Sequence, residues 1–466
     1  MADIIDQIVK ISIQDAISGV TTVDVNTMAI VGRNGTFATR VVDVTPALKS
    51  GTSGAEGSKK ITLNIGDEKF EITTSAADTV ADVIDDLVLA VNDATTGSLI
   101  FTASDNTTKL TLTAKAAGYV GAEISVKSLD GNIVFGSSSV AEITAGVGSN
   151  DAYETASAKR VAEIYGEDSE LYAMAMTFFS QDSQPSRVVC IPAGQSATNA
   201  ELLAKVKLAA AVLDFYHIAV ATNDTEFALS LLTDSATGWQ AWLADAKKVA
   251  EIQVRKTVAV GLKNHGCDRV FVCAHDEIHG TSREFLNVAV VASRCAADSA
   301  RGTFAHKKCN GVTPDTFTVD EYNAWIDGGI NIYTKVSGEA RLFMGTTADN
   351  ETFIDQVIKD DWIRFNVQSR IYQLLGEAND GHGVNYDDAG IASVAASVLN
   401  VLTLAQDTDH QYVMADSASV DYKPYSYLVQ NYAEDVRKRN LPLITGRYAR
   451  MNSIHTVQQV SLYVTL

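Results

Sequence analysis

Apolar and polar positions alternate at the start of the chain. Val9, Ile11 and Ile13 would fall on one side of an extended backbone and polar residues on the other, which is the period of a half-buried strand. Residues 23–32 form a second, more apolar strand pattern. Two interpretations of residues 9–14 stay open: an edge strand of the chain's own sheet, or an arm that pairs with another subunit.

A compact pattern follows a Gly/Ser-rich linker at residues 50–57. Two hairpins of alternating residues enclose a helical pattern at 79–92, whose apolar residues recur every three or four positions. We predict a small inserted α+β domain of hairpin, helix and hairpin over about residues 50–148. Its expected strands are 60–65, 69–73, 99–103, 109–114 and 140–144.

Residues 151–345 change to alternating strand and helix patterns. Short apolar runs of four to six residues are separated by longer helical stretches, which predicts an α/β core with a mostly parallel sheet covered on both faces. The expected strands are 188–191, 216–221, 258–261 and 270–274; the expected helices are 199–213, a helical region extending through residue 250, and 282–300.

The last region, 346–466, is predicted to be an α+β domain with helices at 353–375, 388–406 and 427–439. Its final residues alternate again, with Val460, Leu462, Val464 and Leu466 on one face. An exposed apolar strand edge invites pairing with other chains, so this end is expected to find a partner. The predicted organisation is thus an N-terminal arm with the first core strands (1–40), the inserted domain (50–148), the α/β domain (151–345) and the C-terminal domain with its arm (346–466).

Composition and charge narrow the range of partners. The 466 residues include 37 Lys and Arg against 57 Asp and Glu, a formal charge of −20, which argues against nucleic acid or an anionic membrane as the main partner. The first residues lack a basic leader, and no apolar stretch approaches the roughly 20 residues that cross a bilayer. Five cysteines, an odd number, favour reduced thiols over a disulfide framework. We expect synthesis and assembly in a cytoplasm.

The best candidate for a metal site combines Cys267, Cys273, His275 and His279. Its first spacing is longer than the two to four residues typical of zinc-binding cysteine pairs, and the histidines do not form the H-E-x-x-H signature. Buried thiols and loop histidines explain these residues better. A cytosolic metal-dependent α/β enzyme with a metal at Cys273, His275 and His279 remains an alternative from another class.

Other catalytic patterns are missing or incomplete. Gly32 and Gly35 lack the Gly-Lys-Ser/Thr ending of a phosphate loop, and no Gly-x-Ser-x-Gly elbow occurs. The pair Asp360-Asp361 consists of adjacent residues, which do not face each other on a helix. We therefore predict no catalytic residues, no cofactor and no bound metal, and a protein that is not an enzyme.

Charge is segregated between the two ends of the chain. Residues 1–30 hold four acids and one cation, whereas residues 437–466 hold five cations and no acid. A helix C-terminus stabilised by cations would explain Arg437, Lys438 and Arg439 but not Arg447 and Arg450. The basic end predicts an acidic binding surface nearby.

Several stretches of residues 1–40 and about 150–466 resemble the tail sheath proteins of contractile bacteriophages. Each motif is short and none is catalytic, so their order along the chain carries the resemblance. One departure is Ile164-Tyr165, where paired phenylalanines would be expected. The motifs lie at 158–166, 169–172, 178–181, 185–188, 329–333, 361–364, 387–391 and 447–466. The inserted domain looks like a small domain grafted onto various phage structural proteins.

The resemblance implies a structural subunit that stacks as six-fold rings, in a helical homo-oligomer, around a tail tube. Contraction would drive the tube through the host envelope for genome ejection, with baseplate and tail terminator proteins as further partners and the virion as the location. The arms carrying Val9, Ile11 and Ile13, and Val460 to Leu466, would add strands to a neighbour's C-terminal domain. Arg437, Lys438 and Arg439 would contact the tube. The main rival is another tail assembly protein, such as a tube or baseplate component.

Overall fold

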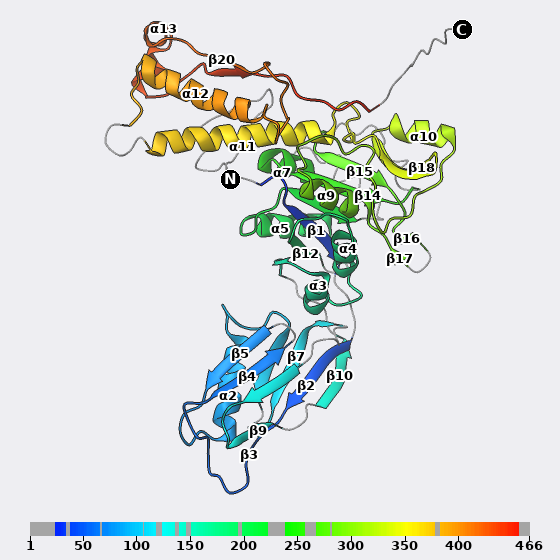
Figure 1. Cartoon of the computed structure of the whole chain (residues 1–466), viewed down its shortest axis with the longest axis vertical. Helices are drawn as coiled ribbons and strands as arrows, with labels where there is room; N and C mark the ends of the chain where they lie inside the picture. Colours follow the sequence, from blue (N-terminus) through cyan, green and yellow to red (C-terminus); the bar gives the residue numbers. More distant parts are fainter. Residues whose placement is uncertain are drawn as a thin grey trace, which may run out of the picture. The chain divides into compact units, whose positions relative to one another are not determined.

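The computed structural model describes most of the chain, and its helices and strands are labelled in Figure 1. Two compact units make up the described chain: the described parts of 1–29, 180–186 and 206–466 form one, and those of 30–179 and 187–205 form the other. The described residues are 24–33, 38–65, 68–105, 107–117, 124–135, 139–145, 151–193, 198–221, 238–256, 267–279, 282–377 and 383–455.

One eight-stranded sheet forms the α/β core. The pairs β13–β14, β14–β15 and β15–β18 are parallel, whereas β11–β12 and β18–β19 are antiparallel, so the predicted mixed, mostly parallel sheet is confirmed. Its strands in spatial order are β11 (Tyr153–Thr155), β12 (Val188–Ala193), β1 (Met28–Arg33), β13 (His217–Ala221), β14 (Val249–Val254), β15 (Val270–Ala274), β18 (Ile330–Val336) and β19 (Glu339–Phe343).

Strand β14 corrects the prediction of a helical region through residue 250. Its sequence, VAEIQV, contains two polar residues, yet all six residues are buried. Glu251 Oε1 lies 2.6 Å from Nδ1 of His217, and the Gln253 amide donates to the carbonyl of Glu284. Because these polar groups are satisfied inside the core, the strand can be buried on both faces. The strand expected at 258–261 lies outside the described residues.

Helices cover this part of the sheet. Helix α9 (Leu286–Ala296) packs on β13, β14 and β15, and α10 (Val319–Ile326) packs on β18. The helix predicted at 282–300 is shorter than expected, and its first predicted residues form β17 (Ser282–Arg283), which pairs antiparallel with β16 (Ile278–His279). Two further helices of the core are α5 (Asn199–Ala210) and α7 (Trp239–Ala246).

Helices α3 (Ala158–Tyr165) and α4 (Glu170–Phe179) pack on each other, and α4 packs on β12. Helix α3 ends at Gly166, whose φ of 98° lies in the region that favours glycine. A Cβ added at Gly32 of β1 would lie 3.1 Å from the backbone nitrogen of Leu171, so a glycine here allows close packing on α4.

The described residues of the lobe that interrupts the core between β1 and β11 form three small sheets and one helix. Helix α2 (Val80–Asn92) begins with a capping box between Thr79 and Asp82 and packs on β5 and β6. The sheets are β10-β2-β7-β6, β5-β4-β8 and β3-β9. Their strands are β2 (Ala38–Val44), β3 (Pro46–Leu48), β4 (Lys60–Ile65), β5 (Glu68–Thr73), β6 (Phe101–Asp105), β7 (Leu110–Ala117), β8 (Ile124–Ser128), β9 (Ile133–Phe135) and β10 (Ser139–Ala145).

The first and last strands of this lobe are direct neighbours. Strands β2 and β10 pair antiparallel, with Ala38 opposite Ala145 and Thr39 opposite Ile143. The predicted hairpin, helix and hairpin pattern is present at the expected residues.

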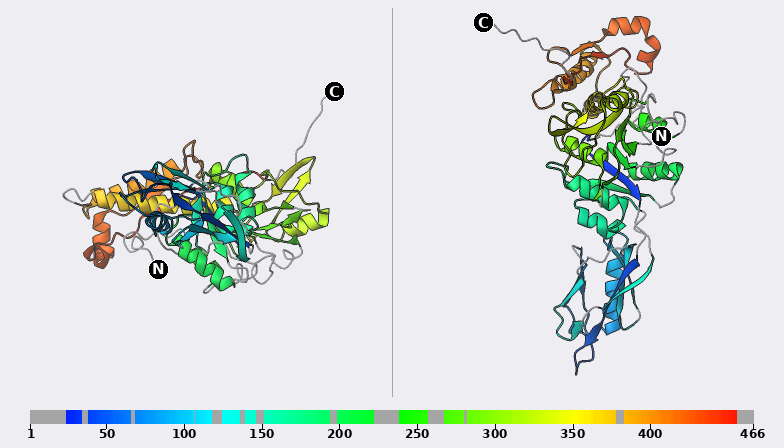
Figure 2. Two further views of the ribbon diagram at one scale, coloured as in Figure 1. Left: turned by 90° about the horizontal axis from the view of Figure 1, so that it is seen from below. Right: turned by 90° about the vertical axis from the view of Figure 1, so that its right-hand side faces the viewer.

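The C-terminal region is built on two helices, α11 (Ile354–Glu377) and α12 (Asp388–Leu404), which lie alongside each other in Figures 1 and 2. Asp387 caps α12 by accepting from the backbone nitrogen of Gly390 at 2.8 Å. The helix predicted at 427–439 is instead two short helices, α13 (Tyr425–Asn431) and α14 (Ala433–Arg437). They are separate because Tyr432, at φ −136° and ψ 38°, leaves the helical conformation.

Among the described residues, every helix is too short or too polar to span a lipid bilayer.

Candidate assembly surface

A two-stranded sheet lies beside α12 in the C-terminal region. Strand β20 (Ser419–Asp421) pairs antiparallel with β21 (Thr445–Arg447) and packs on α12. The described residues give this sheet no third strand, so each strand keeps one edge that no other described strand occupies. An edge of this kind offers backbone N–H and C=O groups to an additional strand.

After β21, residues 449–451 run antiparallel to residues 412–414. Val413 forms an antiparallel bridge with Arg450, the backbone nitrogen of Met414 donates to Ala449, and that of Met451 donates to Tyr412. Gly446 lies inside the paired strand β21, opposite Val420.

The basic cluster Arg437, Lys438 and Arg439 lies where α14 ends. The guanidinium of Arg437 donates to both carboxylate oxygens of Glu434, at 2.6 and 2.8 Å, and Nζ of Lys438 lies 3.2 Å from Glu434. Hydrogen bonds from Arg437 and Lys438 lower the pKa of Glu434. One carboxylate therefore offsets part of the charge of three adjacent exposed cations, which leaves the cluster basic. Its predicted contact with a tube stays a prediction.

Arg447 and Arg450, the other cations of the basic end, have acidic partners within the chain. Arg447 donates to Asp421 at 2.8 Å across the β20–β21 pair. Arg450 binds Asp360, which also accepts from the hydroxyl of Tyr448 at 2.9 Å. Ion pairs within the chain therefore account for Arg447 and Arg450, which stabilisation of a helix C-terminus could not explain.

Asp360 and its neighbour Asp361 have separate roles, as expected for adjacent residues of a helix. Asp361 forms a two-pronged ion pair with Arg269, at 2.7 and 3.0 Å, and accepts from the hydroxyl of Tyr216 at 2.7 Å. Burial lowers the pKa of Arg269, but the charge and hydrogen bonds of Asp361 outweigh burial and raise it above its usual value. Helix α11 is thus held on the core partly by a buried charged pair.

Exposed large apolar side chains gather in the C-terminal region. More than half of those exposed in the described chain fall between residues 372 and 454. Tyrosine and methionine are prominent among them, and both residue types are enriched at protein interfaces. The residues are Tyr372, Leu399, Leu404, Met414, Tyr422, Tyr425, Tyr427, Val429, Leu443, Met451 and Ile454.

Aromatic contacts connect part of this apolar surface with the basic cluster. The ring of Tyr386 lies 6.0 Å from that of Tyr425, and its hydroxyl donates at 2.6 Å to the carbonyl of Asn440, directly after Arg439. Sequence reasoning missed these tyrosines. The Tyr-Lys-Pro-Tyr-Ser-Tyr run at 422–427 was the available signal.

The predicted arm residues Val9, Ile11, Ile13, Val460, Leu462, Val464 and Leu466 lie outside the described residues. Their pairing therefore stays a prediction.

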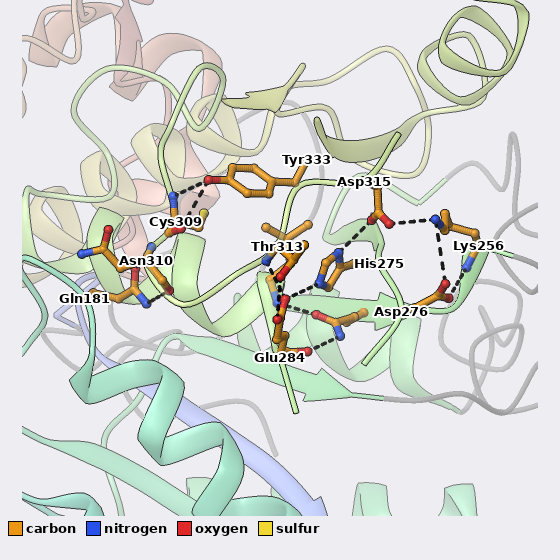
Figure 3. Close-up of polar contacts among 12 residues, drawn as sticks. Gln181, Lys256, His275, Asp276, Glu284, Cys309, Asn310, Thr313, Asp315 and Tyr333 are labelled. Carbon is orange, nitrogen blue, oxygen red and sulfur yellow. Dashed lines mark hydrogen bonds and ion pairs between the residues drawn. The ribbon is translucent and has the colours of Figure 1, made fainter. Parts of the chain in front are cut away.

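His275, one of the four residues of the metal candidate, belongs to a polar network at the carboxyl ends of β14 and β15, drawn in Figure 3. His275 is fully buried; its Nδ1 lies 2.8 Å from Asp315, and its Nε2 lies 3.4 Å from Glu284. Lys256 donates to Asp315 at 2.7 Å, and the hydroxyl of Thr313 donates to Glu284 at 2.8 Å. Burial raises the pKa of Asp315, but the hydrogen bonds from His275 and Lys256 outweigh it and hold the pKa below its usual value.

These contacts make His275 part of a buried polar network with Asp315 and Glu284. Cys267 and Cys273 are buried free thiols, and burial raises the pKa of both. No group of three or more metal-ligating side chains capable of holding a metal occurs among the residues that the structure describes. The side chain of His279 is outside that part of the structure.

Comparisons with known proteins give structural neighbours only. No family model matches the chain, and no curated protein matches it. The helical sheath of the anti-feeding prophage in its contracted state is similar at 15% identity and a TM-score of 0.49, over 68% of this chain and 88% of that chain.

Two further solved structures are similar to the chain. The baseplate of the anti-feeding prophage in its contracted state has 15% identity and a TM-score of 0.43, over 68% of this chain and 89% of that chain. The sheath tail protein of Desulfitobacterium hafniense has 10% identity and a TM-score of 0.34, over 83% of this chain and 76% of that chain. The chain is thus similar to sheath and baseplate structures, at a level that carries no argument by itself.

Proposed function

We propose that this chain is the structural subunit of a contractile tail sheath. The observation that carries the proposal is the order of the tail-sheath motifs along the sequence, from residues 158–166 to 447–466. These motifs coincide with elements that determine the fold: Gly166 ends α3, Asp361 pairs with Arg269, and Asp387 caps α12. Residues in such positions serve architecture, which suits a structural protein.

Subunits would stack as six-fold rings around a tail tube and join into a helical coat. In this assembly the arm carrying Val9, Ile11 and Ile13 and the arm of residues 460–466 would pair with a neighbouring copy. The open edges of β20 and β21 are the acceptors that the proposal assigns to them, since backbone pairing needs no particular side chains. The exposed apolar side chains between residues 372 and 454 would supply the surrounding interface.

Arg437, Lys438 and Arg439 would face the tube protein, with baseplate and terminator proteins contacting the two ends of the coat. Contraction, triggered at the baseplate, would drive the tube through an envelope, so the working location is the tail of a virion. A baseplate component of the same kind of particle is the alternative. A tube protein suits the chain less well, because a tube is expected to be a shorter, strand-rich chain without an α/β core.

Removal of residues 460–466 tests the assembly. We expect the truncated chain to remain folded but monomeric, whereas the full chain forms long hollow cylinders, because the arm's backbone pairs with another copy. Negative-stain electron microscopy and sedimentation velocity report the two states.

The matched control replaces Ser461 and Thr465, on the opposite face of the arm, with alanine and keeps all four apolar residues. This control is expected to polymerise like the unchanged chain. Long tubular polymers formed by the truncated chain would contradict the arm.

A further inference from the structure

The outer face of the β5-β4-β8 sheet is a regular polar surface of the lobe. In β4, Ile61, Leu63 and Ile65 are buried on the inner side, so the residues between them point outward. Strand pairing, continued by the hydrogen bond from the backbone nitrogen of Leu129 to the carbonyl of Lys60, arranges the outward residues in three rows. The rows are Thr73, Lys60 and Leu129, then Glu71, Thr62 and Lys127, then Lys69, Asn64 and Ser125.

Positive charge exceeds negative charge on this surface. The three rows hold three lysines and one glutamate, so we name them the basic sheet face. Glu71 pairs with Lys69 at 2.8 Å and with Lys60 at 3.3 Å, and their hydrogen bonds hold its pKa below its usual value. Leu129, opposite Lys60 and two residues from Lys127, is 58% exposed. An exposed apolar residue bordered by charged ones is typical of a protein interface.

The exposed side of α2 has the opposite charge. Four of its exposed residues follow the i, i+3, i+4, i+7 spacing of a single helix face, named here the acidic helix face: Asp82, Asp85, Asp86 and Leu89. Asp82 belongs to the capping box of α2, but Asp85 and Asp86 lie in the second turn and have no part in it. Leu89 is 70% exposed and lies one turn after Asp85.

Like charges crowd the acidic helix face. Burial, together with the charges of Asp78, Asp82 and Asp85, raises the pKa of Asp86, and none of the described cations opposes this shift. A cationic partner placed on this face would therefore relieve repulsion between carboxylates that the folded chain itself leaves uncompensated.

The two faces are complementary in charge, and each has one exposed leucine. Both are exposed in the same chain, so they do not cover each other there. We infer that the acidic helix face of one copy binds the basic sheet face of a second copy, with Leu89 packed against Leu129. The lysines then offset the crowded carboxylates, and the two leucines leave water together.

This contact joins unlike surfaces, so it is head-to-tail. Each copy offers one acidic helix face and one basic sheet face, and it can bind one neighbour through each. Repeated contacts of this kind close into a ring or continue as a helical array. The inference goes beyond the proposed function, because the contact joins two lobes whether or not their chains belong to a sheath.

Cross-linking between two differently marked copies of the full chain tests the contact. One copy carries Leu89→Cys and the other Leu129→Cys. The natural cysteines are buried free thiols, so a short bismaleimide reacts mainly with the introduced ones. We expect a covalent dimer in the mixture and about tenfold less in either variant alone, because a head-to-tail contact places position 89 beside position 129.

Charge reversal tests whether the faces recognise each other by charge. Lys60→Glu with Lys127→Glu, added to the Leu129→Cys copy, is expected to reduce the cross-linked dimer about tenfold, because like charges then face each other. Lys207→Glu with Lys335→Glu is the matched control: both lysines are exposed outside the lobe, and the change in net charge is the same. This control should leave the yield of dimer unchanged.

A second reversal should repair the contact. Asp85→Lys with Asp86→Lys, added to the Leu89→Cys copy, is expected to restore the dimer with the reversed sheet face, since opposite charges again meet. Asp82 is kept so that α2 retains its cap.

Three results would overturn the inference: no product between positions 89 and 129, equal yields in the single variants, or a dimer that persists after charge reversal. An anionic partner other than a second copy would give the first of these. Cylinders seen by electron microscopy are scored separately, so a sheath without the cross-link contradicts the lobe contact alone, and a cross-link without a sheath contradicts the proposed function alone. Near-ultraviolet circular dichroism checks that each variant is folded.

Discussion

Buried charged side chains help to hold α11 on the core, together with its buried apolar residues. Lys359 is fully buried and pairs with Asp355, and Asp361 pairs with Arg269 and Tyr216. Charged groups are rarely buried without such partners, since removal from water is costly. From the sequence pattern alone, Asp355, Lys359 and Asp361 would be placed on the exposed, polar face of a helix. Only the folded chain reveals that they are inside.

We predict that Arg269→Met destabilises the chain by about 3–5 kcal/mol, because it leaves the Asp361 carboxylate buried without its cation. Chemical unfolding followed by fluorescence measures the loss. Arg447→Met, which breaks the exposed pair with Asp421, is the control and should cost about 0–1 kcal/mol. Equal losses in the two variants would show that the buried pair contributes nothing special.

At the scale of elements, the strongly periodic helices were predictable and the polar strand was not. The patterns at 79–92, 353–375 and 388–406 correspond to α2, α11 and α12, because regular apolar spacing and caps such as Asp387 act locally. Strand β14 was missed because Glu251 and Gln253 are satisfied by partners far away in sequence.

Contacts between residues far apart in the sequence also limited what could be predicted of the candidate surface. The basic cluster at 437–439 could be found from charge alone, whereas the partners of Arg447 and Arg450 could not, because Asp421 and Asp360 are 26 and 90 residues away. Exposure of the tyrosines at 422, 425 and 427 also depends on tertiary packing, which sequence spacing does not report.

The end of α14 provides a test of the tube contact. Replacement of Arg437, Lys438 and Arg439 by glutamate is expected to abolish co-assembly with the tube protein, because the surface then repels acidic groups. Electron microscopy of tails, with a co-sedimentation assay, measures it.

Glu434→Gln is the matched control for this change. It removes the internal carboxylate partner of Arg437 and Lys438 and keeps all three cations, so co-assembly should persist. Tails that look unchanged after the charge reversal would assign the tube contact elsewhere. Circular dichroism excludes loss of the helix as the cause.

At the scale of the whole molecule, each subunit of the proposed coat would favour one of the coat's two states, extended or contracted, by a small free energy. These free energies would add up over many copies. A bias of about 1.4 kcal/mol per subunit is a tenfold preference, and six coupled subunits reach about 8 kcal/mol per ring. A modest bias in each copy is therefore enough for a concerted transition, provided that both arms join neighbours.

The N-terminal arm can be tested without removing any residue. We expect Val9, Ile11 and Ile13, all changed to aspartate, to yield folded chains that do not polymerise, because charged groups replace the apolar side chains that the proposed arm would bury against a neighbour. Light scattering against concentration measures the loss.

The control changes Lys10 and Ser12, on the other face, to glutamine and aspartate, and should assemble normally. If both sets of variants polymerised equally well, residues 9–14 would be an edge strand of the chain's own sheet or would have no part in assembly.

The pairing of β2 with β10 bears on how this chain can be altered. Since Ala38 and Ala145 are opposite each other, the lobe begins and ends within about 5 Å, the spacing of paired antiparallel residues. A module with adjacent ends can be spliced into a host without stretching it, and a short turn can close the gap after its excision. We propose that the lobe can therefore be removed or replaced by another domain, with loss of the Arg160–Glu68 ion pair that joins it to α3.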